Sequence, residues 1–172
     1  MSSNTILRSV NELSLATWFG GSLMGAVGLR RAAATGGEQI AAEDAGWNAW
    51  QPVQTAAVVA QLVSGAGLTV ANRGRYLLQG GVARTSLART GITGAALGAT
   101  VMAARSGERL SDASSSGATA DEIRRLQSRT RLYQAMVPAL TGTMIVLDAL
   151  MGEQQRPEQV ARGVVSRLIP GR

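Results

Sequence analysis

Two charged residues stand in or beside long stretches that are otherwise free of charge. Asp148 is the only charged residue within residues 132–151, and Arg89 directly precedes the uncharged residues 90–104. A carboxylate and a guanidinium that leave water together are held at least cost as a hydrogen-bonded ion pair. The sequence therefore predicts that Arg89 and Asp148 pair, or that each side chain extends separately to a polar boundary.

Further polar residues could widen this pair into a pocket: Glu12, Gln61 and Asn72. Such a pocket could bind a proton, an ion or a lipid head group. Ionisable residues inside a membrane often mark the path of a transported ion. One hypothesis is therefore a small transporter or pore, in which Gln61, Arg89 and Asp148 line a pathway.

Groups that commonly carry catalysis are scarce in this chain. It has no Cys and no His, which excludes disulfides, thiolate or imidazole metal ligands, and catalysis through either residue. It also lacks a glycine-rich phosphate loop with its Lys, paired acids of the kind that bind Mg²⁺ in membrane transferases, and a base for any Ser. The sequence thus predicts no enzyme, no catalytic residue, no cofactor and no metal site.

All 17 basic residues are Arg, and the net charge is +6. Arginine binds phosphate and acidic lipid through its guanidinium fork, but high-GC coding also favours Arg, Ala and Gly together. The coding explanation is the stronger one, because the arginines are scattered. They form no stripe interleaved with aromatic residues, so we expect no nucleic-acid partner.

Charges occur in blocks that are separated by four nearly uncharged segments. A transmembrane helix needs about 20 mostly apolar residues. Three segments meet this length directly, and residues 90–104 meet it when they are extended back to Thr85. The sequence predicts an all-α, four-transmembrane-helix bundle in a single membrane domain, 1–172, with spans at residues 13–29, 53–71, 85–104 and 132–151.

Two other interpretations of these segments are weaker. The mean hydropathy of +0.08 is low enough for a soluble helical bundle. Exposed helices of soluble proteins, however, carry charges on every turn, and these segments carry almost none. A signal peptide cleaved at residues 32–34 is disfavoured by Glu12 before the apolar region and by Arg30 and Arg31 after it.

Aromatic and proline residues agree with this division. Pro52 suits the first turn of the second span, where a missing N–H costs little. Trp18 lies deeper, as a packing residue would. Four aromatic residues lie near the predicted span ends, where interface anchors are enriched: Trp47, Trp50, Tyr76 and Tyr133.

The segment between the third and fourth spans divides into a loop and a helix start. Residues 106–118 contain a Ser-Ser-Ser-Gly sequence and are expected to form a flexible loop. Residues 119–122 then match a capping box that opens a polar helix, which continues into the fourth span. Pro138 is expected to kink that helix.

Both ends of the chain are predicted to be amphipathic. On a helical wheel, residues 157–169 separate an apolar half from a half that carries Arg162 and Arg167. Such a basic amphipathic helix suits a membrane surface or a groove on a partner. A weaker apolar face leads into the first span: Ile6, Leu7, Val10 and Leu13.

Small residues at four-residue spacing predict where helices pack. The first span carries Gly21-x-x-x-Gly25 with Gly28 one turn later, and the third carries Gly94-x-x-x-Gly98. In lipid, helices associate through such close backbone approach. We expect these glycines to form packing seams, either within the bundle or toward another subunit.

Orientation follows from the arginines. Four spans place both termini on one side together with the loop after the second span, and that side holds nine Arg against eight on the other. The acid-free run 73–89 and the basic tail favour termini in the cytoplasm.

The chain resembles the small four-span integral membrane proteins of high-GC Gram-positive, actinobacterial bacteria. The resemblance lies in residues 15–21 (LATWFGG), 68–73 (LTVANR) and 150–157 (LMGEQQRP). It implies a multi-pass location in the bacterial inner membrane, and these motifs carry no known chemistry.

Two functions remain as hypotheses. The first is an accessory or scaffolding subunit of a larger inner-membrane complex, such as a transporter or respiratory complex, or of an assembly of the chain with itself. Small-residue seams, an amphipathic tail and the lack of catalytic groups favour it. The second is the small transporter or pore around Arg89 and Asp148, and a lytic pore is a more distant possibility.

Overall fold

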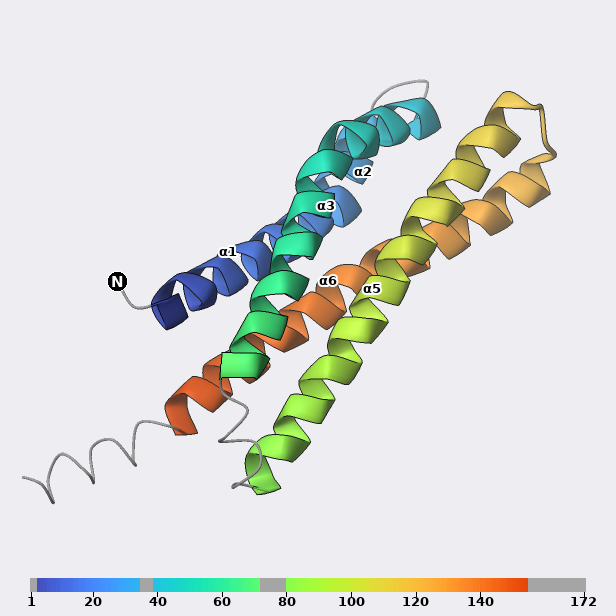
Figure 1. The fold of residues 1–172 in the computed structure, drawn as a ribbon. Helices are drawn as coiled ribbons and strands as arrows, with labels where there is room; N and C mark the ends of the chain where they lie inside the picture. The colour runs from blue at the N-terminus through green and yellow to red at the C-terminus, as the bar shows by residue number, and fades with distance from the viewer. Residues whose placement is uncertain (1–2, 35–38, 72–79, 155–172) are drawn as a thin grey trace, which may run out of the picture.

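A computed structural model describes residues 3–34, 39–71 and 80–154, and these residues form helices (Figure 1). The chain is all-α, as the sequence predicts. The elements are α1 (Ser3–Met24), η1 (Gly25–Leu29), α2 (Arg30–Ala33), α3 (Gln39–Ala71), α5 (Gly80–Ser115) and α6 (Ala120–Gln154). Because α1, η1 and α2 follow one another without a break, the described residues make four helical rods.

The rods form two antiparallel pairs. Helix α1 packs along α3, and α5 packs along α6 (Figure 1). The two pairs meet mainly where α1 crosses α6, while α3 and α5 contact each other far less. The α1–α6 crossing therefore holds the core of the bundle.

Trp18 lies at the centre of this core. It is fully buried and packs with Ala96 and Ala99 of α5 and Val137 of α6. Its indole Nε1 donates a hydrogen bond of 3.2 Å to Thr100 Oγ1. Small residues on α5 thus leave room for one large side chain from α1, as expected for a packing residue at this position.

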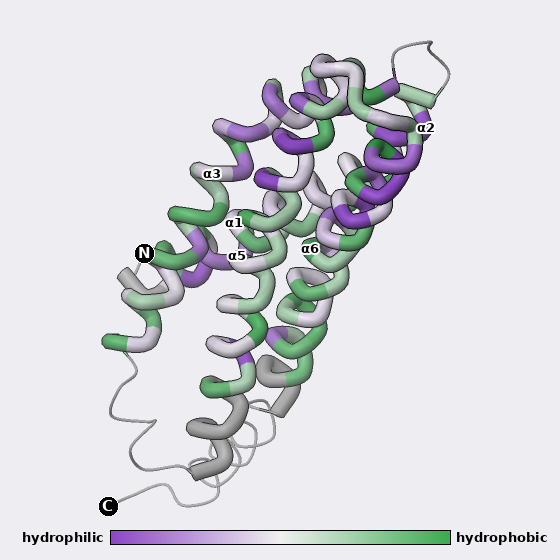
Figure 2. The backbone as a smooth tube through the Cα atoms, turned by 90° about the vertical axis from the view of Figure 1, so that its right-hand side faces the viewer, coloured by the Kyte–Doolittle hydropathy of each residue, from purple (hydrophilic) through white to green (hydrophobic). Residues whose placement is uncertain are grey.

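The bundle buries polar residues and exposes apolar ones. Among the described residues, half of the buried hydrophobic residues are alanines, and they share the interior with nine polar residues. Large apolar side chains are instead exposed on every rod, for example Leu13, Val63, Leu87 and Val146. Hydrophilic residues gather at the end that holds α2 and the α5–α6 turn (Figure 2).

Helix α1 shows this inversion most clearly. Its buried stripe contains Asn11, Ser14, Leu15, Trp18 and Ser22, at helical spacing. The apolar face expected near the N-terminus is exposed at three of its four residues: Ile6, Val10 and Leu13. The fourth residue of this face, Leu7, lies beside Gly67 of α3.

Two tryptophans of α3 rest on two glycines of the first rod. A Cβ added to Gly21 would lie 2.3 Å from the ring of Trp50, and one added to Gly25 would lie 2.2 Å from the ring of Trp47. Only glycine permits this approach, because no real Cβ comes so near another atom. The predicted seam on the first span is therefore occupied, within this chain, by α3.

The prediction of four spans is confirmed only in part. Two helices are long and apolar enough to cross a membrane: α3, over Gln39–Ala71, and α6, over Ala120–Leu150. The rods that contain residues 13–29 and 85–104 do not reach this hydropathy. The physical reason is their content of Gly, Ser and Thr, small residues that lower hydropathy without adding charge.

The predicted loop at residues 106–118 is wrong over most of its length. Helix α5 continues to Ser115, because its buried stripe continues through Ser106 and Leu110. At its end Gly117 adopts a φ of +75°, and the N–H of Ala118 donates to the carbonyl of Ala113. This is a Schellman ending, which favours glycine at that position.

The capping box is confirmed on its serine/threonine side. The N–H of Glu122 donates to Thr119 Oγ1 over 3.4 Å, and α6 begins at the next residue, Ala120. The helix continues without a break through Pro138 to Gln154, as predicted from the sequence. Asp121 forms an exposed ion pair with Arg124 in the first turn.

Pro52 does not begin its helix. It lies inside α3, which begins thirteen residues earlier at Gln39. The contacts of Trp47 and Trp50 with the first rod stabilise the additional turns. Tyr76 and the C-terminal amphipathic segment 157–169 lie outside the described residues.

The seam under Trp50 leads to a prediction about stability. Gly21→Ala is expected to lower the free energy of unfolding by about 1–3 kcal/mol, because the methyl group overlaps the indole ring. The control Gly94→Ala meets nothing within 4 Å and should stabilise its helix by up to about 1 kcal/mol. Thermal unfolding of the purified variants measures both, and equal melting temperatures would contradict the seam.

Candidate functional site

Six polar side chains from all four rods meet in one cluster, which we call the polar junction: Asn11, Ser14, Gln61, Ser64, Arg89 and Asp148. Its residues come from α1, α3, α5 and α6. Asn11, Ser14, Gln61 and Ser64 are each at most 6% exposed. Buried polar groups require hydrogen-bond partners, so the junction constrains how the four helices meet.

Arg89 and Asp148 form the ion pair at one side of the junction. Arg89 Nη2 donates to Asp148 Oδ2 over 2.8 Å, and the side chains are 24% and 12% exposed. This pairing is one of the two arrangements that the sequence predicts, because both residues lie about one turn inside their segments on the same side of the bundle. The contact joins α5 to α6.

Asn11 connects that ion pair to the other half of the bundle. Its Oδ1 accepts a 2.8 Å hydrogen bond from the same Arg89 Nη2. Its Nδ2 donates to Ser64 Oγ over 3.1 Å and to the carbonyl of Gln61 over 3.4 Å. One amide therefore contacts α3 and α5 from its place on α1.

A second link between α1 and α3 completes the junction. Ser14 Oγ lies 2.8 Å from Gln61 Oε1 and 2.9 Å from the carbonyl of Asn11. Ser64 Oγ also donates to the carbonyl of Ala60, one turn earlier in its own helix. The neutral members thus satisfy one another while the charged pair closes the other side.

The sequence identified half of this junction. Gln61, Arg89 and Asp148 are brought together. Glu12 is exposed on α1 but lies near enough to Asp148 for an electrostatic interaction, and Asn72 lies outside the described residues. Asn11, Ser14 and Ser64 were missed. Their signal was present as polar residues at three-residue spacing, Asn11 with Ser14 and Gln61 with Ser64.

The chemistry available to the junction is that of a packed ion pair. Among the described residues, no group of three or more acidic side chains could hold a metal ion. Arg89 Nη2 donates hydrogen bonds to Asp148 and to Asn11, both inside the protein. Arg89 Nε is buried without a hydrogen-bond partner. The arrangement joins helices and leaves little free for a substrate.

A different arrangement is found on the outer side of α5. The glycine face of α5 consists of Leu87, Gly91, Gly94, Gly98 and Val101, which alternate in spacing between four and three residues. All five are exposed, and a Cβ added to any of the three glycines would meet nothing within 4 Å. This spacing is that of a helix-packing seam, and no described residue of the chain covers it.

The remaining predicted packing and anchor residues have mixed surroundings. Gly28 would meet only Met24 of its own rod, so no neighbouring helix packs on it among the described residues. Trp47 and Trp50 are half-buried against α1 and η1, and Tyr133 is half-buried on α6. Their position relative to a membrane interface stays a prediction.

Comparison of the chain with known protein families, with curated proteins and with solved structures finds no match.

The polar junction predicts strong coupling between its charged residues. Arg89→Gln and Asp148→Asn should each lower the free energy of unfolding by about 3 kcal/mol, because each leaves a partly buried charge without its partner. The double variant should lose less than the sum, by about 1–3 kcal/mol. Denaturant unfolding of the four proteins measures this cycle, and strict additivity would show that the pair does not interact.

Proposed function

We propose that this chain is an accessory or scaffolding subunit of a bacterial inner-membrane complex, such as a transporter or respiratory complex, or of an assembly with further copies of itself. The observation that carries the proposal is the glycine face of α5. Three glycines lie open along one helix between exposed Leu87 and Val101. In lipid, such a face lets a second helix approach closely and gain van der Waals contact.

The distribution of side chains supports a membrane location for all four rods. Among the described residues, the rods bury nine Asn, Gln, Ser and Thr residues and expose many of their Leu, Val, Ile and Met side chains. Water would oppose this arrangement, whereas a hydrocarbon solvent favours it, because polar groups must then find partners inside the bundle. We infer that the rods of α1 and α5 cross the bilayer beside α3 and α6, despite their lower hydropathy.

The proposed orientation follows the charges and the resemblance to actinobacterial four-span proteins. The hydrophilic end with α2 and the α5–α6 turn would lie outside the cytoplasm (Figure 2). Both termini would lie in the cytoplasm, where arginine-rich segments are retained. The polar junction would then sit near the cytoplasmic side of the bilayer.

A small transporter or pore around Arg89 and Asp148 is the second candidate. Burial of an ionisable pair among polar side chains favours it. Its weakness is that the pair is bonded to itself and to Asn11, so transport would require these contacts to open. The subunit proposal requires no such rearrangement and assigns the chain no chemistry of its own.

Membrane placement is testable by cysteine labelling, since the chain has no native Cys. A membrane-impermeant maleimide should label Ser116→Cys, at the α5–α6 turn, in whole cells. Ser9→Cys, exposed near the N-terminus, should react only after permeabilisation. Val63→Cys and Val146→Cys should stay unlabelled although both valines are largely exposed in the isolated chain. Efficient labelling of the two valine positions would contradict placement of these faces in lipid.

Association through α5 is testable on native gels of gently solubilised membranes. The wild-type chain should migrate in a larger complex, and Gly94→Leu with Gly98→Leu should release it, because two added side chains separate the helices. Gly20→Leu is the matched control, since Gly20 is an open glycine on α1. A wild-type chain that migrates alone would refute the proposal, and disulfide crosslinking of Gly94→Cys distinguishes self-association from a different partner.

A further inference from the structure

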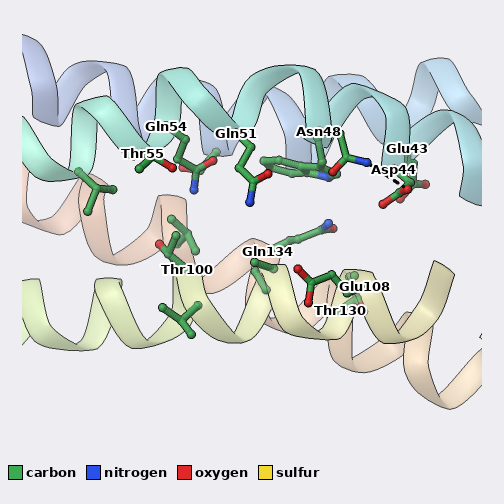
Figure 3. A pocket seen from close by; sticks show the side chains of 18 of the residues that line it. Glu43, Asp44, Asn48, Gln51, Gln54, Thr55, Thr100, Glu108, Thr130 and Gln134 are labelled. Carbon is green, nitrogen blue, oxygen red and sulfur yellow. Dashed lines mark hydrogen bonds between the residues drawn. The ribbon is translucent and has the colours of Figure 1, made fainter. Parts of the chain in front are cut away.

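A cavity of about 300 Å³ lies between α3 and α5, with α6 behind it (Figure 3). This volume is at the lower end of the range for small-molecule sites, about 300–1,000 Å³. Exposed lining residues such as Gln51, Thr55 and Glu108 show that solvent reaches it. The cavity is separate from the polar junction, because none of the six junction residues lines it.

One end of the cavity is acidic. Glu43 and Asp44 of α3 and Glu108 of α5 line it, and no basic residue does. In the part of the chain that the structure describes, the ion pairs are Arg89–Asp148 and Arg124–Asp121, so these three acids have no cationic partner. Asp44 accepts hydrogen bonds from Asn48 and Ser111, which holds its carboxylate between α3 and α5. A negative cavity in a chain of net charge +6 favours a cation.

An aromatic ring lies beside these acids. Trp47 lines the cavity, and its contact with Gly25 keeps the indole in place. Indole faces attract ammonium and guanidinium groups, most strongly where water is displaced. Acidic and aromatic groups together are typical of sites that bind organic cations.

The wall formed by α6 contains a polar group without a partner. Thr130 is 4% exposed, and its Oγ1 makes no hydrogen bond. Gln134, one turn further along α6, is 8% exposed and lines the same wall (Figure 3). A buried hydroxyl that lacks a partner carries a free-energy penalty, which a bound molecule could relieve.

The opposite end of the cavity is apolar. Val58 and Val59 of α3, Leu97 of α5 and Val137 of α6 line it. A ligand that matches both ends must join a positive group to an apolar body. Its polar atoms would lie near Thr130 and Gln134.

We propose that this cavity binds an amphiphilic organic cation, with an ammonium group beside Trp47, Glu43 and Glu108 and an apolar body toward Leu97 and Val137. Two sources share this chemistry: a free organic amine, and the amine head group of a bilayer lipid. The proposal does not depend on the subunit function, because a single chain forms the whole cavity.

Binding is tested by calorimetric titration of the full chain in a neutral detergent. Benzyltriethylammonium is the probe, and benzenesulfonate is the control of opposite charge. The cation should bind, and the sulfonate should bind at least tenfold more weakly. Equal binding of the two, or no binding of the cation, would overturn the proposal.

Two variants test the polar side chains of the binding site. Glu108→Gln should weaken cation binding about two- to fivefold, because it removes one partly solvated charge. Thr130→Val keeps the shape of the side chain and removes the unpartnered hydroxyl, so the chain should fold while affinity falls for a probe that can donate a hydrogen bond, benzyldimethylammonium. Unchanged affinity in both variants would place the cation elsewhere.

Gly107→Trp fills the cavity with little risk to the fold. Gly107 lines the cavity, and a Cβ added there meets nothing within 4 Å. The added ring should weaken binding by about tenfold or more, since it occupies the space of the ligand. Gly20→Trp is the matched control, because a Cβ added to Gly20 on α1 also meets nothing within 4 Å and Gly20 does not line the cavity. Equal effects of the two variants would contradict this location.

Lipid nanodiscs distinguish the two sources. Displacement of the probe by phosphatidylcholine but not by phosphatidylglycerol would identify a lipid amine as the ligand. Retention of the probe in both lipids, with sensitivity to Gly107→Trp, would identify a free organic cation. Displacement by phosphatidylglycerol alone would overturn the preference for positive charge.

Discussion

The contact between Asn11 and the Arg89–Asp148 ion pair is the interaction on which the arrangement of the bundle depends. Arg89 Nη2 donates to the carboxylate of Asp148 on α6 and to the amide oxygen of Asn11 on α1, both over less than 3 Å. The amide nitrogen of Asn11 in turn donates to Ser64 on α3. A helix that shifts by one turn would break several of these contacts at once. In a bundle with few large buried side chains, such directional bonds specify register better than apolar packing can.

The rest of the interior is consistent with this constraint. Alanine and glycine let the backbones approach, and single large residues fill the spaces that remain, such as Trp18 at the centre and Trp47 and Trp50 over the first rod. The two helix pairs approach closely where α1 crosses α6 and stay further apart elsewhere. Helices α3 and α5 meet little, and the cavity occupies the space between them. The way the two helix pairs pack thus leaves the space that forms the candidate ligand site.

Polar and apolar residues share the interior of this bundle. Among the described residues, nine polar side chains are buried beside ten apolar ones, and large apolar side chains are exposed on every rod. Hydropathy alone identifies α3 and α6 but not the other two rods. Gly, Ser and Thr lower the mean hydropathy of those two rods without adding charge. The open glycines of α5 are the surface on which the proposed contact with a neighbouring helix rests.

The sequence by itself determined the helical class, the approximate positions of the four rods, the Thr119 cap and the attraction between Arg89 and Asp148, because these follow from local spacing and from the cost of burying charge. Only the tertiary structure decided which glycines are covered. Gly21 and Gly94 stand in identical motifs, yet Trp50 packs on one and nothing within 4 Å meets the other. It also decided that Asn11 joins the ion pair and that α5 continues past Arg105. Such choices depend on residues far apart in the chain, whose meeting no local pattern encodes.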